Sequence, residues 1–310
     1  EDGVMVDSAI RALEQVYAPS LYTIYVIADS LQKKTLQLLK ELPIEVVEVS
    51  FEKSTKAKAL NVTMKQLDAS YQIAVVLDAD NVMEVNFLQK VNEAYNAGFL
   101  AIQGHRIAKN QENNLSVLDA ISEEVNNNIF RKGHRALGFS SALIGSGMAF
   151  DLKLFQKEMS EIDAIGGFDK ELELRLLKKG IKIGYLEEAV VYDEKVSKEE
   201  AFTNQRTRWI AAQIRYGLGS FGNALIHLIT RFNLDYFDKS LQFLLPPRLI
   251  LLGVSTVLAL VFTFFQWIHW EWVLSIWGAF ILALAIAVPR QFYNRHTASA
   301  LLHLPKTFWL

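Results

Sequence analysis

A short apolar run that ends in two carboxylates constrains the fold of this chain more than any other feature. Residues 73–76 (Ile-Ala-Val-Val) are predicted to form a buried strand, and residues 78–81 (Asp-Ala-Asp-Asn) follow it closely. In open α/β sheets, ligands bind beyond the carboxyl ends of the strands. Asp78 and Asp80 there suit Mg²⁺ or Mn²⁺, which proteins bind through one or two carboxylates plus substrate phosphates. The alternative is a simple turn, because Asp and Asn are common turn residues.

Composition limits the class of protein. The chain has 310 residues, of which 51% are hydrophobic, and its formal net charge is −2. This length allows one large domain and a smaller second part, and the charge offers no electrostatic reason to expect nucleic acid as a partner. Because the chain has no cysteine, disulfides, thiolate catalysis and cysteine zinc sites are excluded. The six histidines are scattered, so we expect them to be structural or solvated.

Strand and helix patterns alternate through the first 225 residues. Runs rich in β-branched and aromatic residues predict strands, and segments with helical spacing predict the helices between them. The predicted strands are 22–28, 44–49, 71–77, 100–103, 142–150 (a strand pair or a strand and a turn) and 181–192, and the predicted helices are 31–42, 86–97 and 115–132. This alternation predicts an α/β fold with a mostly parallel sheet. Strands that are apolar along their whole length predict helices on both faces.

After about residue 225 the composition changes. Residues 249–267 and 272–288 carry no charge, and each stretch approaches the length of about 20 residues that a membrane span needs. A buried core helix is the alternative, chiefly for the second stretch. The predicted domains are therefore a catalytic domain over residues 1–225 and a part made of interfacial and transmembrane helices over residues 226–310.

The flanks of the two apolar stretches predict an orientation. Basic residues precede the first stretch and follow the second, whereas the connector, residues 266–271, has neither Lys nor Arg. The positive-inside rule then predicts a helical hairpin in the cell inner membrane, with the domain of residues 1–225 in the cytoplasm. Residues 220–245 and 293–310 are predicted to lie on the membrane surface, and Pro246-Pro247 would break any continuous helix.

Asp169 is a second candidate for chemistry. It follows Gly166, Gly167 and Phe168 and opens an amphipathic helix predicted over residues 170–179. A carboxylate in that place could act as the general base that deprotonates an acceptor hydroxyl. The alternative is a helix N-cap, a position that Asp favours.

Residues 205–209 (Gln-Arg-Thr-Arg-Trp) form a third motif. A helix would place Gln205, Arg208 and Trp209 on one face, at i, i+3 and i+4. Arg208 could then neutralise a phosphate leaving group, and Trp209 could stack on a sugar ring. The alternative is a basic helix that touches lipid headgroups.

Two weaker motifs complete the set. Lys56, at the start of a helix between two strands, could reach a diphosphate as a point charge, or it could be a solvated lysine. Gly145, Ser146 and Gly147 could let a ligand approach the backbone closely, since glycine has no Cβ.

Taken in order along the chain, these motifs resemble those of a known family. Asp29 at a strand end, Lys56 to Asn61, the Asp78–Asp80 pair, Asp169, and Gln-x-x-Arg-Trp are followed by apolar helices. The chain resembles the membrane-bound family-2 glycosyltransferases, which include cellulose, chitin and hyaluronan synthases. The resemblance covers nearly the whole chain, and Gln-x-x-Arg-Trp downstream of Asp-x-Asp is its most specific part.

The resemblance implies a GT-A nucleotide-sugar fold and inversion at the anomeric carbon. It assigns the sites residue by residue: Asp29 to the uracil, Lys56 to the diphosphate, Asp78 to the ribose and metal, Asp80 to the metal, Asp169 to the base, Gly145 to Met148 to the acceptor site, and Gln205, Arg208 and Trp209 to the diphosphate and acceptor end. The implied partners are a UDP-sugar, a saccharide or lipid-linked acceptor, and the lipid bilayer. A further membrane subunit and a processive polysaccharide synthase are left open.

Two departures and three rival functions remain. The family usually carries Thr-Glu-Asp where this chain has Gly167-Phe168-Asp169, and its first strand is expected before residue 1, with Glu1-Asp2 as a remnant. A nucleotidyltransferase would share the sheet but would not need Gln-x-x-Arg-Trp. A non-catalytic membrane subunit could keep the fold as a scaffold. A small transporter conflicts with the large domain that precedes the apolar stretches.

Overall fold

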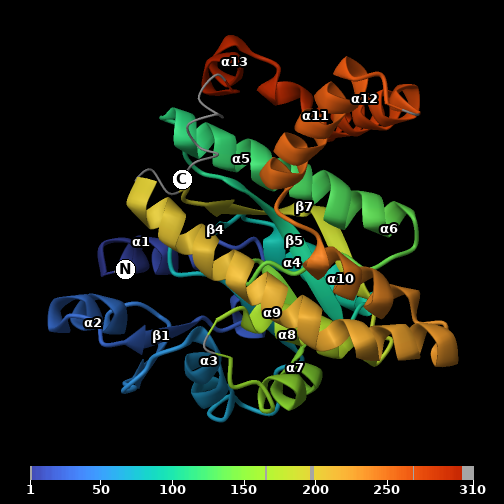
Figure 1. Ribbon diagram of the computed structural model, residues 1–310. Coiled ribbons are helices and arrows are strands. Elements are labelled where there is room, and N and C mark those ends of the chain that lie inside the picture. The colour runs from blue at the N-terminus through green and yellow to red at the C-terminus, as the bar shows by residue number, and fades with distance from the viewer. Residues whose placement is uncertain (1, 165, 196–198, 268, 302–310) are drawn as a thin grey trace.

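The computed structural model describes residues 2–164, 166–195, 199–267 and 269–301 (Figure 1). A two-stranded parallel sheet near the N-terminus is formed by β1 (Tyr25–Asp29) and β2 (Glu45–Val49). Three helices accompany it: α1 (Asp2–Ala12), α2 (Lys33–Lys40) and α3 (Lys56–Met64). Met5, Ala9, Val26 and Leu39 form the buried core of this part. Burial of these apolar side chains on one face of each element holds the small sheet in place.

The main sheet has five strands in the order β3 (Ile73–Val76), β6 (Met148–Asp151), β5 (Ala101–Ala108), β7 (Ile183–Asp193) and β4 (Val82–Met83). Only the β5–β7 pair is parallel, and the other three pairs are antiparallel. The prediction of a mostly parallel sheet is therefore wrong. Alternation predicts parallel strands only where each helix crosses over to a neighbouring strand. Here β4 follows β3 without a helix, and β6 returns between β3 and β5 in the opposite direction.

Two predicted strands have different lengths in the structure. The strand predicted over residues 100–103 continues to Ala108, because its polar second half pairs with β7 after a bulge at Gly104/His105. Conversely, the segment predicted over residues 142–150 contributes only β6, because Gly145 and Gly147 have positive φ values that a strand does not accommodate. The local apolar pattern predicted the lengths of these two strands incorrectly, because the pairing partners decide where a strand ends.

Helices cover both faces of the main sheet, as predicted. On one face, Phe87 and Val91 of α4 (Phe87–Asn96) pack against Ile102 and Ala149. On the other face, α7 (Leu152–Met159) and α8 (Phe168–Lys178) pack against residues of β3, β5, β6 and β7. Phe150 of β6 stacks on Phe155 of α7 with ring centres 4.6 Å apart. Because successive side chains of a strand point to opposite faces, Phe150 and Ala149 belong to different cores.

One long helical segment lies beside β5. The helix α5 (Asn114–Asn126) starts with a capping box between Asn113 and Ser116, and it continues as a π-helical turn, Asn127–Gly133, into α6 (His134–Ala136). Val117 and Ile121 of α5 pack against Ala287 and Phe292 of the C-terminal helices. The last helices of the chain therefore pack on α5.

The C-terminal part consists of helices. The 33-residue helix α9 (Glu199–Arg231) crosses the front of the molecule and contains residue 225, the predicted domain boundary (Figure 1). It is followed by α10 (Leu234–Leu244), α11 (Arg248–Phe264), α12 (Trp270–Ala287) and α13 (Arg295–Leu301). The helix break predicted at Pro246-Pro247 is confirmed, and α10 and α11 meet there at 70°. Residues 302–310 of the predicted surface segment lie outside the described residues.

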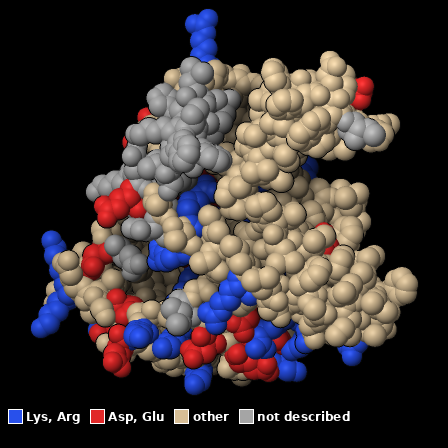
Figure 2. Space-filling model, in the orientation of Figure 1, with Lys and Arg blue, Asp and Glu red and all other residues tan. Residues whose placement is uncertain are grey.

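The two apolar stretches form neighbouring helices. The indole Nε1 of Trp277 in α12 donates to Thr256 Oγ1 in α11 at 3.0 Å. The length and composition of α12 would allow it to cross a membrane. The helices α10 and α11 would provide a second crossing if the bent pair forms a single span. Figure 2 shows that the side of the molecule formed by α10, α11 and α12 carries few charged side chains. Membrane insertion of these helices stays a prediction.

Candidate functional site

The loop after β3 holds its two carboxylates in place through the residues around them. Ala79, between the two carboxylates, packs against the core of the small sheet. The backbone N–H of Asp78 donates to Ser146 Oγ at 2.9 Å, and the hydroxyl of Ser146 donates to Asn81 Oδ1. Because Ser146 and Asn81 are both buried, these bonds fix the loop from its inner side.

Lys56 connects this loop to two other motifs. It opens α3, whose N-terminus is capped by Thr55. Its Nζ forms an ion pair with Asp78 and donates to the carbonyl oxygen of Gly145 at 2.8 Å. The same Nζ lies 5.8 Å from the ring centre of Phe168. The predicted diphosphate lysine therefore lies between the carboxylate loop and the loop of the predicted base.

The glycines beside Ser146 have separate structural reasons. Gly145 has φ +82°, and a Cβ placed there would lie 3.8 Å from Cγ of Asp169. Gly147 has φ +63°, and its Cβ would lie 3.2 Å from Val191. Gly145 thus borders the predicted base, whereas Gly147 packs inside the sheet. The acceptor contacts expected for Gly145, Ser146 and Gly147 stay predictions, and the Ser146 hydroxyl is already engaged by the loop.

Asp169 lies in the first turn of α8. Gly167, with φ +70°, occupies the N-cap position, so the alternative that Asp169 serves as the N-cap is wrong. The Asp169 side chain is only 14% exposed, and its Oδ2 lies 3.9 Å from Lys170 Nζ. The fold therefore brings Lys56, Asp78, Gly145 and Asp169 together from four different segments of the chain.

Asp29 lies apart from this group, at the end of β1. Its carboxylate accepts hydrogen bonds from the hydroxyls of Ser30 and Ser54. Ser30 has a positive φ of 58°, so the chain turns sharply directly after Asp29. The small sheet thus presents a polar edge beside α3, whose first residue is Lys56.

The Gln-x-x-Arg-Trp motif is helical, as predicted, and lies on α9. Gln205 is half-buried, Arg208 is exposed, and Trp209 is 41% exposed. Further along the same helical face, Ala212 and Tyr216 lie against Gly167, where an added Cβ would be 3.0 Å from the Ala212 Cβ. Since α-helices rise about 1.5 Å per residue, Trp209 lies roughly 5 Å along the axis from Ala212. The motif's face is therefore turned toward the loop that carries Asp169.

Arg206 has a different role from that of Arg208. Its Nη2 pairs with Asp119 of α5 at 2.7 Å, and its guanidinium lies 5.8 Å from the ring centre of Trp209. The alternative of lipid contact for this basic helix does not describe Arg206, which joins α9 to α5. Of these two arginines, Arg208 is the one for which a phosphate contact stays predicted.

The sequence reasoning missed a group of charged residues beside Asp80. The register of β4 and β7 pairs Val82 with Tyr192, which brings Asn81 next to Asp193. The Nδ2 of Asn81 donates to Asp193 Oδ1 at 2.9 Å and to Asp80 Oδ1 at 3.0 Å. The available signal was an acidic residue directly after an apolar strand, the same pattern that singled out Asp78.

Asp193 is itself anchored by buried charges. Lys195 Nζ lies 2.8 Å from Asp193 and also pairs with Glu123 of α5. Arg106 of β5 makes two hydrogen bonds to Glu123, at 3.0 and 3.2 Å. Burial opposes the charge of Arg106, but Glu123 and Asp193 outweigh it and raise its pKa. The network fixes Asp193 at the edge of the site.

Asp80 lies in a negative environment. Burial raises its pKa, and the negative charges of Asp193 and Asp78 raise it further. A bound cation would relieve this repulsion, because it offsets the charge of both carboxylates. The negative environment of Asp80 therefore fits a cation ligand.

The residues present fit a divalent cation that takes most of its ligands from a substrate. Among the described residues, no three His, Asp or Glu side chains form a complete metal centre. Asp80 still provides a hard oxygen ligand, and the amide of Asn81 holds Asp193 beside it. Asp78, the other predicted ligand, is paired with Lys56. Mg²⁺ is typically held by one or two carboxylates plus phosphate oxygens, and Mn²⁺ accepts the same donors.

Comparison with known proteins decides the family. The model of the family described as glycosyl transferase family group 2 matches residues 73–293, well over half of the chain. The chain belongs to this family. The protein is a glycosyltransferase. A search of curated protein sequences found no significant match.

Solved structures support the fold. The mannosyltransferase PcManGT from Pyrobaculum calidifontis, in complex with GDP-Man and Mn²⁺, is 14% identical to this chain, with a TM-score of 0.55 over 92% of this chain and 83% of that chain. S. aureus TarS 1-349 in complex with UDP-GlcNAc is 11% identical, with a TM-score of 0.48 over 99% and 88% of the two chains. The similarity to PcManGT shows a GT-A-like α/β fold for this protein.

Proposed function

We propose that this glycosyltransferase moves a sugar from a UDP-sugar to a saccharide or lipid-linked acceptor, with inversion, at the cytoplasmic face of the cell inner membrane. The observation that carries the proposal is the convergence of Lys56, Asp78, Gly145 and Asp169. These four residues come from separate segments, and together they provide a cation, a carboxylate, an open backbone position and a second carboxylate. A single displacement needs this combination of groups.

The proposed transfer is one step. Asp169 accepts the proton of the acceptor hydroxyl while that oxygen forms a bond to the anomeric carbon, and the bond from this carbon to the diphosphate oxygen breaks. Lys56 and Arg208 neutralise the charge that develops on the diphosphate. When bound at Asp80 and Asp193, a Mg²⁺ or Mn²⁺ ion supplies further positive charge there. Gly145 leaves space beside Asp169 because it has no side chain.

The donor nucleotide is proposed from the position of Asp29. This residue closes β1 and presents a carboxylate that two serine hydroxyls orient. A carboxylate held in this way accepts hydrogen bonds from the N–H of a pyrimidine base. PcManGT is described with GDP-Man and TarS with UDP-GlcNAc, so a guanine nucleotide is the alternative to test.

The membrane location is supported by surface character. Only 6% of α12 is buried in the structure, and its mean hydropathy of 1.8 suits an apolar medium. Exposed apolar side chains on α11, such as Val257, Leu260 and Phe264, would likewise face lipid. Insertion of both helices as a hairpin would hold the catalytic domain beside the bilayer, where a lipid-linked acceptor is available.

The test is nucleotide release by the protein in membranes. A panel of UDP-sugars and GDP-mannose is supplied with Mn²⁺ or Mg²⁺, and Asp169→Asn is compared with the exposed control Asp163→Asn. Loss of the general base should lower turnover by about 10²–10⁴-fold while donor binding is kept. Normal turnover in Asp169→Asn would contradict the assignment. Metal-dependent donor binding without release in the unmodified protein would favour a non-catalytic scaffold.

A further inference from the structure

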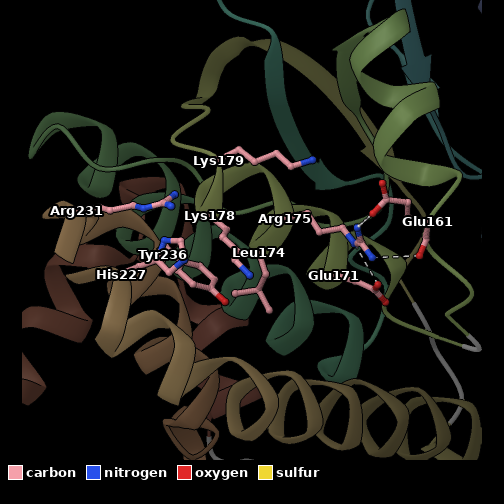
Figure 3. A pocket seen from close by; sticks show the side chains of 9 residues that line it. All are labelled: Glu161, Glu171, Leu174, Arg175, Lys178, Lys179, His227, Arg231 and Tyr236. Carbon is pink, nitrogen blue, oxygen red and sulfur yellow. Dashed lines mark hydrogen bonds and ion pairs between the residues drawn. The ribbon is translucent and has the colours of Figure 1, made fainter. Parts of the chain in front are cut away.

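A second site lies on the outer side of α8. A hollow of about 500 Å³ opens between α8, α9 and α10 (Figure 3). Glu171, Arg175 and Lys178 line it from α8, and His227 and Arg231 line it from α9. These α8 residues, spaced i, i+4 and i+7, lie on the face opposite Asp169, because each residue turns the helix by 100°. The hollow is therefore separate from the transfer site.

The two ends of the hollow differ in charge. At one end, Arg175 is neutralised by Glu161 at 2.6 Å and Glu171 at 3.2 Å. At the other end, Figure 3 shows Lys178 and Arg231 on the same side as His227. Within the described part of the chain, neither Lys178 nor Arg231 forms an ion pair. This end therefore carries two positive charges without a neighbouring carboxylate to balance them.

His227 is a buried polar group at this end. Its side chain is 9% exposed, and its Nδ1 is fully buried with no hydrogen-bond partner in the described structure. Burial lowers the pKa of His227, and the charges of Arg231 and Lys178 lower it further. Buried polar atoms are normally hydrogen-bonded, so the unpartnered Nδ1 leaves this end incompletely satisfied.

Exposed apolar side chains occur close to Arg231 in the sequence. Ile229 is 71% exposed and Phe232 is 83% exposed, one on each side of Arg231 in the sequence. Phe232 has a φ of 52°, an uncommon value for a bulky residue, and Leu234 beyond it is also exposed. Cations next to exposed aromatic and aliphatic side chains are the arrangement of a surface that lies in the headgroup region of a bilayer.

We propose that the end of the hollow formed by Lys178, His227 and Arg231 binds the phosphate of an anionic phospholipid, while Phe232 and Leu234, which follow Arg231, lie among its acyl chains. The inference rests on the membrane location proposed above, but not on the sugar-transfer chemistry. The charge of this end determines which lipid binds, because two unpaired cations favour a headgroup with net negative charge over a zwitterionic one. The structural alternative is that Lys178 and Arg231 only stabilise the C-terminal turns of α8 and α9, where the helix dipole favours positive charge.

The first experiment measures lipid binding by the whole protein in a neutral detergent. Dihexanoyl phosphatidylglycerol, dihexanoyl phosphatidylcholine and inorganic phosphate are titrated separately by calorimetry. The test variant Lys178→Gln/Arg231→Gln is compared with Lys33→Gln/Lys34→Gln, which loses the same charge on the exposed α2. We expect phosphatidylglycerol to bind most tightly, and the test variant to lose about 10- to 100-fold in affinity while the control keeps it.

A second measurement follows the ionisation of His227. Its ¹³C-labelled imidazole resonance, assigned with His227→Gln, is titrated against pH with and without phosphatidylglycerol. A phosphate next to His227 should raise its pKa, because a nearby negative charge favours the protonated ring. A purely structural role for Lys178 and Arg231 predicts no lipid-dependent change.

Three outcomes would overturn the inference. They are equal phosphatidylglycerol affinity in the test variant, equal affinity for phosphatidylcholine, and inorganic phosphate binding as tightly as the lipid, which would indicate a free-anion site. Nucleotide release measured on the same preparations separates this inference from the proposed function. Release without selective lipid binding removes only the lipid site, and selective lipid binding without release leaves the lipid site intact.

Discussion

Asp193 and Asp80 share one side-chain amide: Asn81 Nδ2 lies 2.9 Å from Asp193 Oδ1 and 3.0 Å from Asp80 Oδ1. The two carboxylates are thus held side by side, although 112 positions separate Asn81 from Asp193. Their mutual repulsion contributes to the raised pKa of Asp80. The strand end that carries Asp193 is therefore next to the carboxylate of the Asp-x-Asp motif that we propose as a cation ligand.

Substitution Asp193→Asn should change how metal binding depends on pH. Only ionised Asp80 binds a cation, so affinity falls as the pH drops through its raised pKa. Removing the negative charge of Asp193 should move the pKa of Asp80 toward the ordinary aspartate value, and the fall should then occur at lower pH. Mn²⁺ titrations with UDP over a pH series, followed by the paramagnetic resonance of free Mn²⁺, measure this. The exposed Asp163→Asn, which makes the same change away from the site, is the control, and an unchanged pH midpoint in Asp193→Asn would show that the two carboxylates are not coupled.

Substitution Ser146→Ala should weaken the carboxylate loop. The change leaves the backbone N–H of Asp78 and the buried Oδ1 of Asn81 without their partner. Unsatisfied buried groups cost about 1–3 kcal/mol each, so the thermal unfolding temperature and the metal-dependent donor affinity should both fall. Substitution of the exposed Ser160→Ala is the matched control. Unchanged donor affinity in Ser146→Ala would mean that the loop keeps its geometry without this hydroxyl.

Substitution Glu123→Gln should be strongly destabilising. Glu123 neutralises buried Arg106 and Lys195, and these two cations depress its pKa despite its burial. Removing one partner of a buried ion pair costs about 3–5 kcal/mol, because the remaining charges stay uncompensated. Thermal unfolding of the purified protein tests this against the exposed Glu112→Gln. Similar melting of both variants would show that Glu123 does not hold the network together.

Interaction between His134 and Asp238 should make stability depend on pH. The hydrogen bond to Asp238 raises the pKa of His134, whose Nε2 lies 3.2 Å from the Asp238 carboxylate. A raised histidine pKa contributes stability that is fully present below the unfolded value of about 6.5 and is lost as pH rises through the folded value. The melting difference between the unmodified protein and His134→Gln should therefore shrink with rising pH. Asp238→Asn should remove the same dependence, and a constant difference would argue against the pair.

Much of the candidate site could be predicted from the sequence, because its chemistry is local. The carboxylates after β3, the aspartate after two glycines and the helical spacing of Gln205, Arg208 and Trp209 are all visible in short windows. Turns and helix periodicity depend on neighbours within a few positions, so they can be predicted without knowledge of the fold. For the same reason most strands and helices lie where the patterns predicted them.

The contribution of Asp193 could not be predicted in this way. Its residue type is ordinary for a strand end, and only the antiparallel pairing of β4 with β7 brings it beside Asn81. The burial of Arg106, Glu123 and Lys195 could not be predicted either, because isolated charged residues in a sequence are usually solvated. Their burial follows from the packing of α5 on β5.

The sequence by itself determined the reacting groups, the helical face of the Gln-x-x-Arg-Trp motif and the apolar character of α11 and α12. Only the tertiary structure decided the mixed sheet, the burial of Ser146 and the approach of Asp193 to Asp80. The physical reason is the distance along the chain over which each interaction acts. Periodicity and turn chemistry act between near neighbours, whereas strand order and charge burial depend on apolar packing between segments far apart in the chain.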